Sequence, residues 1–198
     1  MTEPVPEPAV LGRREQHKLD TRRALEDAAL ELFARDGFER TTVEAIAERA
    51  QVSPRTFFRY FAAKEEVLNM GWTKRRERLH ELTTRAPREA ADLDVAVAAL
   101  AAIAVEFEPE LERVRLRAAA VATSSALRGR TADSMAAWEA ALARGLAGRR
   151  GLEHPDDQAT VAAAVALGLW RWATRRWVTQ QSTPPLADLV RAAADRLP

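Results

Sequence analysis

Two arginines, Arg55 and Arg59, stand four residues apart just after a Ser53-Pro54 pair. Serine followed by proline is a strong helix-start signal, with Ser53 as the cap and Pro54 at the first helical position. Side chains four residues apart lie on one face of a helix, about 5–6 Å from each other. Two guanidinium groups on a short exposed helix suit the major groove of DNA, where arginine reads guanine through paired hydrogen bonds. This spacing therefore predicts a DNA-reading helix.

The residues before this helix predict a second short helix and a tight turn. Thr41 and Glu44 have the spacing of a capping box, in which each side chain satisfies a backbone amide at a helix start. About three residues then separate the two helices, which describes a helix-turn-helix. Thr42, Tyr60 and Lys64 flank the arginine face and are candidates for phosphate contacts. A solvated basic face on an ordinary helical hairpin is the alternative interpretation.

The rest of the chain predicts an all-α fold. It is rich in alanine, the best helix former, and no window shows the alternation of a strand. The first helix is expected to begin at Asp20 or Thr21 and to end before Gly37, with Phe38 folding back on its last turn. Eight further helices, which bring the total to about nine, are expected at roughly 43–50, 53–61, 64–84, 90–107, 110–127, 131–148, 156–181 and 185–197.

Composition excludes several classes of site. The chain has no cysteine, which removes disulfides, thiol catalysis and thiolate metal sites. Its three histidines are far apart in sequence, so neither a metal nor another cofactor is expected. No apolar run reaches the roughly 20 residues of a membrane span, and the first residues lack a hydrophobic signal core. We therefore expect a cytoplasmic protein with no membrane partner. The net charge is +1, but residues 13–88 carry an excess of Lys and Arg.

Residues 21–68 resemble the DNA-binding domain of the TetR family of bacterial transcriptional regulators in order, spacing and most apolar positions. The string VSPRTFFRYF, with Gly-Arg-Arg before the first helix, further resembles an actinobacterial subgroup. The resemblance implies phosphate contacts by Thr42, Tyr60 and Lys64. It also implies that four residues face base edges: Pro54, Arg55, Thr56 and Arg59. Position 58 usually carries a tyrosine, and Phe58 offers contact area without a hydroxyl. The predicted DNA-binding residues are Thr42, Ser53, Pro54, Arg55, Thr56, Phe58, Arg59, Tyr60 and Lys64.

Arg13, Arg14 and Lys18 lie between an acidic, proline-containing tail and the expected first helix. Their positive charges predict an arm that enters an adjacent minor groove, whose negative potential attracts arginine. A frayed basic terminus is the alternative interpretation.

The resemblance also implies that successive parts of the chain form domains with different functions. We expect a flexible tail at 1–12, a helix-turn-helix domain at 13–68 with a linking helix to about 85, and a ligand-binding and dimerisation domain at 69–198. One helix-turn-helix offers too few contacts for a specific site, so a homodimer on a palindromic double-stranded DNA operator is expected. The predicted dimer interface, from the last two helices, is Val161, Val165, Gly168, Trp172, Leu186, Leu189 and Val190.

The family's ligand pocket is expected against the other side of the long helix at 156–181. An aromatic and methionine lining suits a small, mostly apolar effector, with Arg171 or Arg175 available for an anionic group. The subgroup resemblance makes acyl-CoA and fatty-acid-like molecules candidates. Aromatic residues at helical spacing are also what an ordinary core contains. The predicted lining is Phe107, Met135, Trp138, Leu167, Trp170, Arg171, Thr174 and Trp177.

Three candidate functions differ in how well they account for these features. A homodimeric, ligand-responsive repressor accounts for the helix-turn-helix. An enzyme with an all-α pocket lacks any nucleophile–base motif, metal spacing or phosphate loop. A protein-interaction module that binds other regulators without DNA is the remaining alternative. The sequence favours the DNA-binding transcriptional repressor.

Overall fold

The structure is a computed structural model that describes residues 12–69, 71–180 and 184–197. The predicted all-α fold is confirmed, since these residues form nine α-helices, two short 3-10 helices and no strand. Residues 1–11 of the predicted flexible tail lie outside the described part. The elements in chain order are α1 (Arg13–Asp36), α2 (Val43–Arg49), α3 (Pro54–Tyr60), η1 (Lys64–Asn69), α4 (Trp72–Thr84), α5 (Asp92–Phe107), η2 (Glu108–Glu110), α6 (Leu111–Thr123), α7 (Ser125–Arg149), α8 (Asp157–Thr179) and α9 (Leu186–Ala194).

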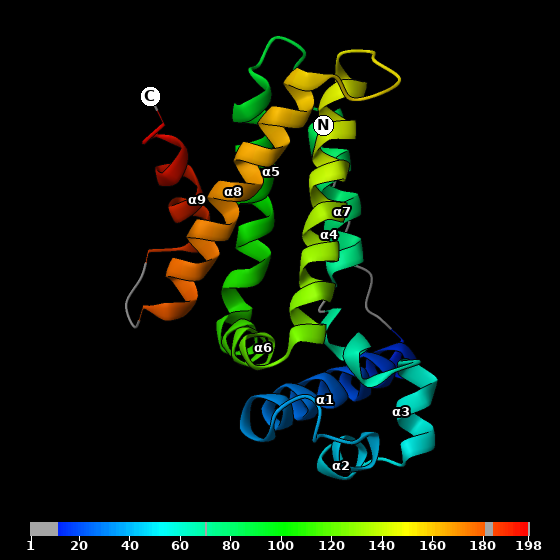
Figure 1. Ribbon diagram of the computed structural model, residues 1–198. Coiled ribbons are helices and arrows are strands. Elements are labelled where there is room, and N and C mark those ends of the chain that lie inside the picture. Colours follow the sequence, from blue (N-terminus) through cyan, green and yellow to red (C-terminus); the bar gives the residue numbers. More distant parts are fainter. Residues whose placement is uncertain (1–11, 70, 181–183, 198) are drawn as a thin grey trace, which may run out of the picture.

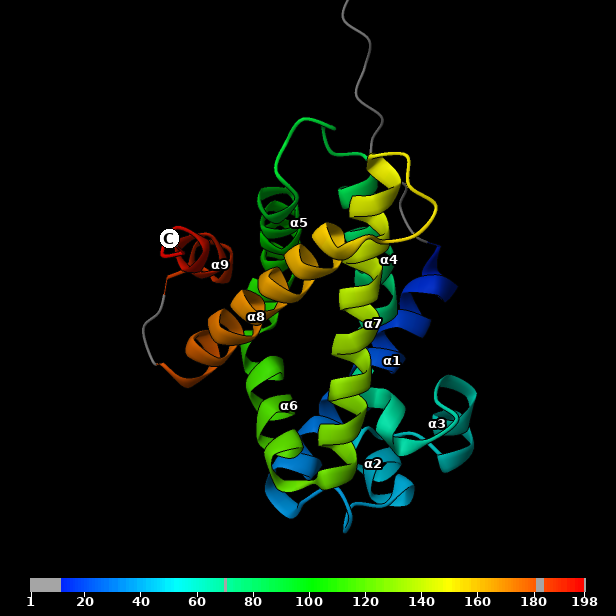
Figure 2. The ribbon, with the colours of Figure 1, turned by 45° about the horizontal axis from the view of Figure 1, so that its top comes forward.

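The helices separate into a small group at one end and a set of long helices. Helices α1, α2 and α3 gather at the lower end in Figure 1, while α4 and α7 run side by side away from them. Helix α5 packs against α8 and α9, and the turned view places α6 over α1 (Figure 2). The two parts of the molecule are thus joined by the α1–α6 contact and by the covalent link through η1 and α4.

Helix α1 has the buried face that its apolar spacing predicts. Leu25, Ala29 and Phe33 are fully buried. The turn after the helix is also as expected: Gly37 has φ +88°, and Phe38 packs edge-on against Phe33 with ring centroids 5.1 Å apart. The start is different, because α1 begins at Arg13 rather than at Asp20 or Thr21. These extra turns are exposed, so no apolar spacing marked them in the sequence.

Two predicted helix boundaries are wrong for identifiable reasons. The helix expected from Lys64 to Thr84 is divided, because Gly71 adopts a left-handed conformation between η1 and α4. The break expected near Gly129 is absent, and α7 runs through this residue. The chain breaks at Ser124 instead, whose hydroxyl oxygen accepts a hydrogen bond from the Leu127 amide and so caps α7. A glycine inside a helix costs only about 1 kcal/mol, which tertiary packing outweighs.

Gly145 of α7 lies where α4 and α7 approach most closely. A Cβ atom at this position would lie 1.8 Å from Oγ1 of Thr83 and 2.9 Å from the backbone oxygen of His80. The Thr83 hydroxyl cannot simply rotate away, because it donates to backbone oxygens of its own helix. Gly145 therefore sets the distance between α7 and α4, the helix that leads away from the end formed by α1, α2 and α3.

We expect Gly145→Ala to destabilise the protein by about 1–3 kcal/mol, the usual cost of overpacking a close contact. Gly129→Ala is the matched control on the same helix, because no atom would lie within 4 Å of its Cβ. This change should stabilise α7 by up to about 1 kcal/mol through helix propensity. Urea unfolding of both variants measures the difference, and equal midpoints would contradict the close approach.

Candidate functional site

Helix α2 begins with a cap one residue later than predicted. The Thr42 hydroxyl oxygen accepts a hydrogen bond from the Ala45 amide at 3.2 Å. Thr41 is buried and donates its hydroxyl to the Gly37 oxygen at 2.9 Å. The predicted capping box of Thr41 and Glu44 is therefore wrong, because Thr41 is used to close the preceding turn. Thr42 is exposed at the helix start, and its own O–H is left to donate.

The turn between α2 and α3 follows the predicted helix-turn-helix. Gln51 takes the left-handed conformation, φ +57°, that a tight turn requires. The Val52 amide then donates to the Ala47 oxygen at 2.9 Å. Ser53 caps α3 by accepting from the Thr56 amide at 3.1 Å, and Pro54 follows at the first helical position. The buried ring of Phe57 fills the space beneath α3.

The outer face of α3 carries the two predicted arginines in an accessible position. Arg55 and Arg59 are both exposed, and within the described ranges no carboxylate forms an ion pair with either. The ring of Phe58 is 56% exposed beside them. The Arg59 guanidinium lies 5.2 Å from the ring centroid of Tyr60, which is half-buried. Large, unpaired basic and aromatic groups thus project from one short helix.

Two hydroxyls lie at the start of this face. The Ser53 and Thr56 side-chain oxygens are 3.0 Å apart, so one hydroxyl donates to the other. Ser53 and Pro54 are exposed and Thr56 is half-buried. Ser53 and Thr56 thus lie in the first turn of the helix that carries the arginines, and Thr42 caps the preceding helix.

Lys64, for which the resemblance implies a phosphate contact, is held by contacts within the protein. Its Nζ donates to the backbone oxygens of Phe38 at 2.7 Å and Thr41 at 2.8 Å, and it lies 4.3 Å from the ring centroid of Phe38. The ammonium group thus holds the segment between α1 and α2 against the start of η1. These contacts favour a positioning role over the phosphate contact predicted for Lys64.

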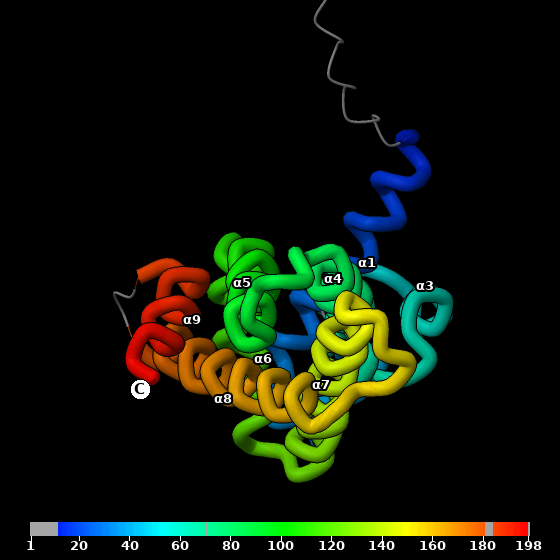
Figure 3. The backbone as a smooth tube through the Cα atoms, turned by 90° about the horizontal axis from the view of Figure 1, so that it is seen from above, coloured from blue at the N-terminus to red at the C-terminus, as the bar shows by residue number. Residues whose placement is uncertain are grey.

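The basic residues of the predicted arm are helical. Arg13, Arg14 and Lys18 lie in the first turns of α1, and all three are exposed. The Lys18 Nζ lies 3.2 Å from Oε2 of Glu15, a contact of exposed side chains. Viewed from above, this end of α1 projects beyond the other helices (Figure 3). The expectation that these residues precede the first helix is therefore wrong, because α1 starts earlier.

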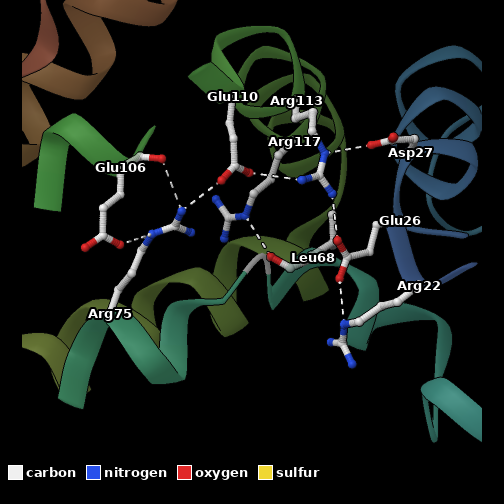
Figure 4. Close-up of polar contacts among 9 residues, drawn as sticks. All are labelled: Arg22, Glu26, Asp27, Leu68, Arg75, Glu106, Glu110, Arg113 and Arg117. Carbon is white, nitrogen blue, oxygen red and sulfur yellow. Dashed lines mark hydrogen bonds and ion pairs between the residues drawn. The ribbon is translucent and has the colours of Figure 1, made fainter. Parts of the chain in front are cut away.

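An ion network joins α1 to α6 where the two parts of the molecule meet (Figure 4). Arg113 of α6 contacts three carboxylates: Glu26 at 2.7 Å, Asp27 at 2.6 Å and Glu110 at 3.0 Å. Burial opposes the charge on Arg113, but the hydrogen bond that Arg113 donates to Glu26 and the nearby carboxylates outweigh this effect and raise the pKa of Arg113. On the α4 side, Arg75 reaches Glu110 at 2.9 Å. The network ties the helix-turn-helix end to the long helices.

A pocket of about 380 Å³ lies next to this network. Its walls come from η1, α4, α6 and α7, and Trp72 and Trp138 form its aromatic side, with ring centroids 5.1 Å apart. Arg117 of α6 lines it, although no sequence argument selected this residue. The available signal was its spacing, since Arg117 stands three residues after buried Val114 and three before buried Ala120, in an otherwise apolar stripe.

The pocket predicted along α8 is a packed core instead. Phe107, Trp138, Leu167, Trp170 and Trp177 are each at most 4% exposed. The Trp170 ring contacts the rings of both Phe107 and Trp138, with centroids 5.7 Å apart in each case. Of the predicted lining, Trp138 alone borders the observed pocket. The remaining three predicted residues fall elsewhere: Arg171 is exposed, and Met135 and Thr174 are half-buried.

The predicted dimer surface is divided between an exposed and a buried half. Val161, Val165 and Trp172 on α8 are 61%, 36% and 43% exposed, and Gly168 lies open between them. Figure 3 shows helix α8, which carries these residues, from above. On α9, Leu186, Leu189 and Val190 are at most 5% exposed, because they pack inward against α5 and α8. Their predicted place in an interface between chains is therefore wrong.

Two family models match this chain. A model described as bacterial regulatory proteins of the tetR family matches residues 25–69, which contain α2, α3 and η1. A second, described as the MftR C-terminal domain, matches residues 90–198, more than half of the chain. The chain belongs to the TetR family. The members it resembles are transcriptional regulators rather than enzymes, as the sequence predicts.

Similar TetR-family sequences come from Streptomyces and mycobacteria. The HTH-type transcriptional regulator TcmR of Streptomyces glaucescens is 57% identical over 56 residues, which are 28% of this chain and 25% of TcmR. The HTH-type transcriptional repressor KstR of Mycolicibacterium smegmatis is 33% identical over 81 residues, 39% of this chain and 40% of KstR. The alignments thus span less than half the length of these curated relatives.

Solved TetR-type structures share the fold over most of the chain. NalD, the secondary repressor of the MexAB-OprM multidrug efflux pump in Pseudomonas aeruginosa, has a TM-score of 0.61 at 18% identity, covering 91% of this chain and 96% of NalD. Thermus thermophilus FadR in complex with lauroyl-CoA has a TM-score of 0.54 at 23% identity, covering 88% and 91%. At these identities the likeness concerns the fold. In the described residues, no helix is both long and apolar enough to cross a membrane.

Proposed function

We propose that this transcriptional regulator is a homodimeric repressor that binds a palindromic operator and is released by a small effector. Residues 13–68 bind DNA, and residues 69–198 form the dimer and hold the effector. The observation that carries the proposal is the pair of exposed arginines on capped helix α3, neither of which forms an ion pair in the part of the chain that the structure describes. Arginine is the commonest specific reader of the major groove, and each bidentate contact with guanine discriminates by about 1–3 kcal/mol.

The residues around these arginines divide into base and phosphate contacts. Arg55, Arg59, Phe58 and Pro54 project from the exposed side of α3 toward the bases. Thr56 faces the bases as well. The hydroxyls of Thr42 and Ser53, with Tyr60, contact phosphates, which fix the register without reading sequence. Lys64 acts indirectly, because its ammonium group holds the segment before α2. The exposed basic turns at the start of α1 add a further DNA contact, as a helical extension.

The exposed stripe on α8 supports the dimer. Val161, Val165 and Trp172 expose a continuous apolar strip that monomers rarely leave uncovered. Ala164 and Gly168 within the strip have little or no side chain, so a second helix can approach closely. A two-fold axis through this surface places two copies of α3 on one side of the dimer, where they read two half-sites about one helical turn apart.

The effector acts through a coupling free energy between two sites. DNA prefers one spacing of the two α3 helices and the effector prefers another, so each weakens binding of the other by the same factor. The effector is small and largely apolar, and acyl-CoA or fatty-acid-like molecules are candidates. Among proteins of this fold, the FadR neighbour was solved with lauroyl-CoA and the SmeT neighbour with triclosan.

The test is selection of random DNA duplexes on the purified full chain, followed by sequencing of the bound pool. Enrichment of an inverted repeat supports the proposal and supplies a probe for effector screening by release. If no sequence is enriched at low salt, the selection is repeated after the protein is denatured, stripped of bound molecules and refolded. A second failure would overturn the DNA-reading function and favour an interaction module.

Val161→Glu is expected to weaken the dimer at least tenfold. The change puts one buried carboxylate on each side of the proposed two-fold contact, where like charges repel and lose water. Val105→Glu is the matched control, because Val105 is a similarly exposed helical valine, 54% exposed, on α5 away from the strip. Sedimentation equilibrium of both variants measures dimer dissociation. Equal effects of the two changes would show that α8 is not the interface.

A further inference from the structure

Three arginines converge beneath α6, and one of them has no acidic partner (Figure 4). Arg113 and Arg75 each contact two or more carboxylates. The Arg117 guanidinium forms no ion pair with any residue that the structure describes. Its contacts are a hydrogen bond from Nε to the Leu68 oxygen at 3.1 Å and one from Nη2 to Oγ1 of Thr131 at 3.2 Å.

The position of Arg117 makes an unpaired charge costly. Its guanidinium lies 4.5 Å from the ring centroid of Trp72, and burial lowers the pKa of Arg117 to about 10. A cation loses its bound water on burial, which costs free energy. This cost is ordinarily offset by an ion pair with a nearby anion. Nη1 of Arg117 makes no hydrogen bond with the described residues and is not enclosed by them, so it is accessible to a ligand in the pocket. Arg117 therefore carries both a charge and a donor that an anionic group would satisfy.

The pocket that Arg117 lines has an amphipathic wall. Trp72 packs against Trp138, which is 1% exposed and closes the apolar side. Arg76, one turn after Trp72 on α4, also lines the pocket and has no ion pair with the described residues. Three acidic residues also line the pocket, and each lies in a different environment from the arginines. Glu66 accepts the Ala62 amide, Glu65 lies 3.9 Å from Arg130, and Asp133 is exposed on the α7 side.

We propose that this pocket binds a small organic anion, with its carboxylate on Arg117 and Arg76 and its flat apolar body against Trp72 and Trp138. The proposal rests on the proposed function, since it names the class of the effector. The volume of about 380 Å³ fits a molecule of two or three fused or linked rings. This site differs from the one predicted along α8, where Arg171 or Arg175 was the candidate for an anionic group.

The same arginine links the pocket to the DNA-binding end. Leu68, whose backbone oxygen accepts from Arg117, belongs to η1, and η1 also supplies part of the pocket wall. An anion that turns the guanidinium toward itself weakens this bond. Binding in the pocket therefore alters the hold of α6 on η1, which follows directly after α3.

The experiment compares two probes of the same shape on the full chain by isothermal titration calorimetry. 1-Naphthaleneacetate carries the carboxylate, and 1-naphthaleneacetamide replaces it with a neutral amide. We expect the carboxylate to bind at least tenfold more tightly. Arg117→Gln should remove this preference, and Arg117→Lys should keep part of it because it keeps the charge. Arg171→Gln is the control and should bind both probes as the unmodified protein does.

Several outcomes would overturn the proposal. They are equal affinity for the two probes, no binding of the carboxylate at millimolar concentration, a preference that survives Arg117→Gln, and an equal loss in Arg171→Gln. Thermal unfolding is recorded for each variant. If Arg117→Gln does not fold, Arg76→Gln and Arg117→Lys are measured in its place. The proposal then requires a reduced preference for the carboxylate probe in both variants. Calorimetry needs no DNA, so the two proposals can fail independently. If the carboxylate does not bind, an operator can still be selected. If no operator is selected, the preference for the carboxylate can still be measured.

Discussion

Replacing Arg113 with methionine is expected to destabilise the protein by about 3–5 kcal/mol, the usual cost of breaking a buried charge pair. Methionine keeps much of the apolar stem but leaves Glu26, Asp27 and Glu110 facing one another without the cation that they share. The Arg113 side chain is 15% exposed and that of Glu26 is 10%, so water offers little compensation. The loss should appear first as loosening of α1 from α6.

Urea unfolding measures the stability, and hydrogen exchange of α1 amides locates the change. Arg22→Met is the control at the edge of the same network. Arg22 contacts Glu26 at 3.0 Å but is 42% exposed, and exposed pairs contribute at most about 1 kcal/mol. If the two variants lose equal stability, the network does not hold the two parts of the molecule together.

Arg55→Ala and Arg59→Ala are expected to remove discrimination at particular base pairs of the operator. Each arginine that contacts guanine through two hydrogen bonds contributes about 1–3 kcal/mol, and a dimer makes every contact twice. The loss in affinity for the selected operator should therefore be about 2–6 kcal/mol. Binding to unrelated DNA should fall much less, since phosphate contacts supply it. Fluorescence anisotropy with single-base variants of the selected operator identifies the positions affected.

Arg144→Ala is the matched control for these substitutions. Arg144 is an exposed arginine on α7, so its loss changes the net charge equally without touching α3. It should shift all DNA affinities slightly and leave sequence preference unchanged. A Lys64→Ala variant should weaken all sequences alike, because it disturbs the segment before α2 rather than a base contact. Intact preference in Arg55→Ala and Arg59→Ala would show that α3 is not the reading helix.

The DNA-proximal helices could be predicted from the sequence because their signals are local. Ser53 starts α3 by accepting hydrogen bonds from the amides of Thr56 and Phe57, and Gly37 ends α1 by donating its amide to the Phe33 oxygen, so each bond spans at most four positions. The buried face of α1 follows from helical periodicity alone. The spacing of Arg55 and Arg59 needs only the pitch of one helix. These features depend on nothing beyond neighbouring residues, and the family match covers the same segment.

Only the tertiary structure determines where the pocket forms and which apolar helix faces are buried. A stripe shows that a helix face is apolar but not what covers it. The Leu189 face is buried by α5 and α8 of its own chain, whereas the Val161 face stays open. Arg113 meets Glu26 across 87 residues of sequence, and no local rule pairs Arg113 with a carboxylate while leaving Arg117 without one. Such contacts exist only once packing has chosen which helices are neighbours, because burial and charge balance are properties of that arrangement.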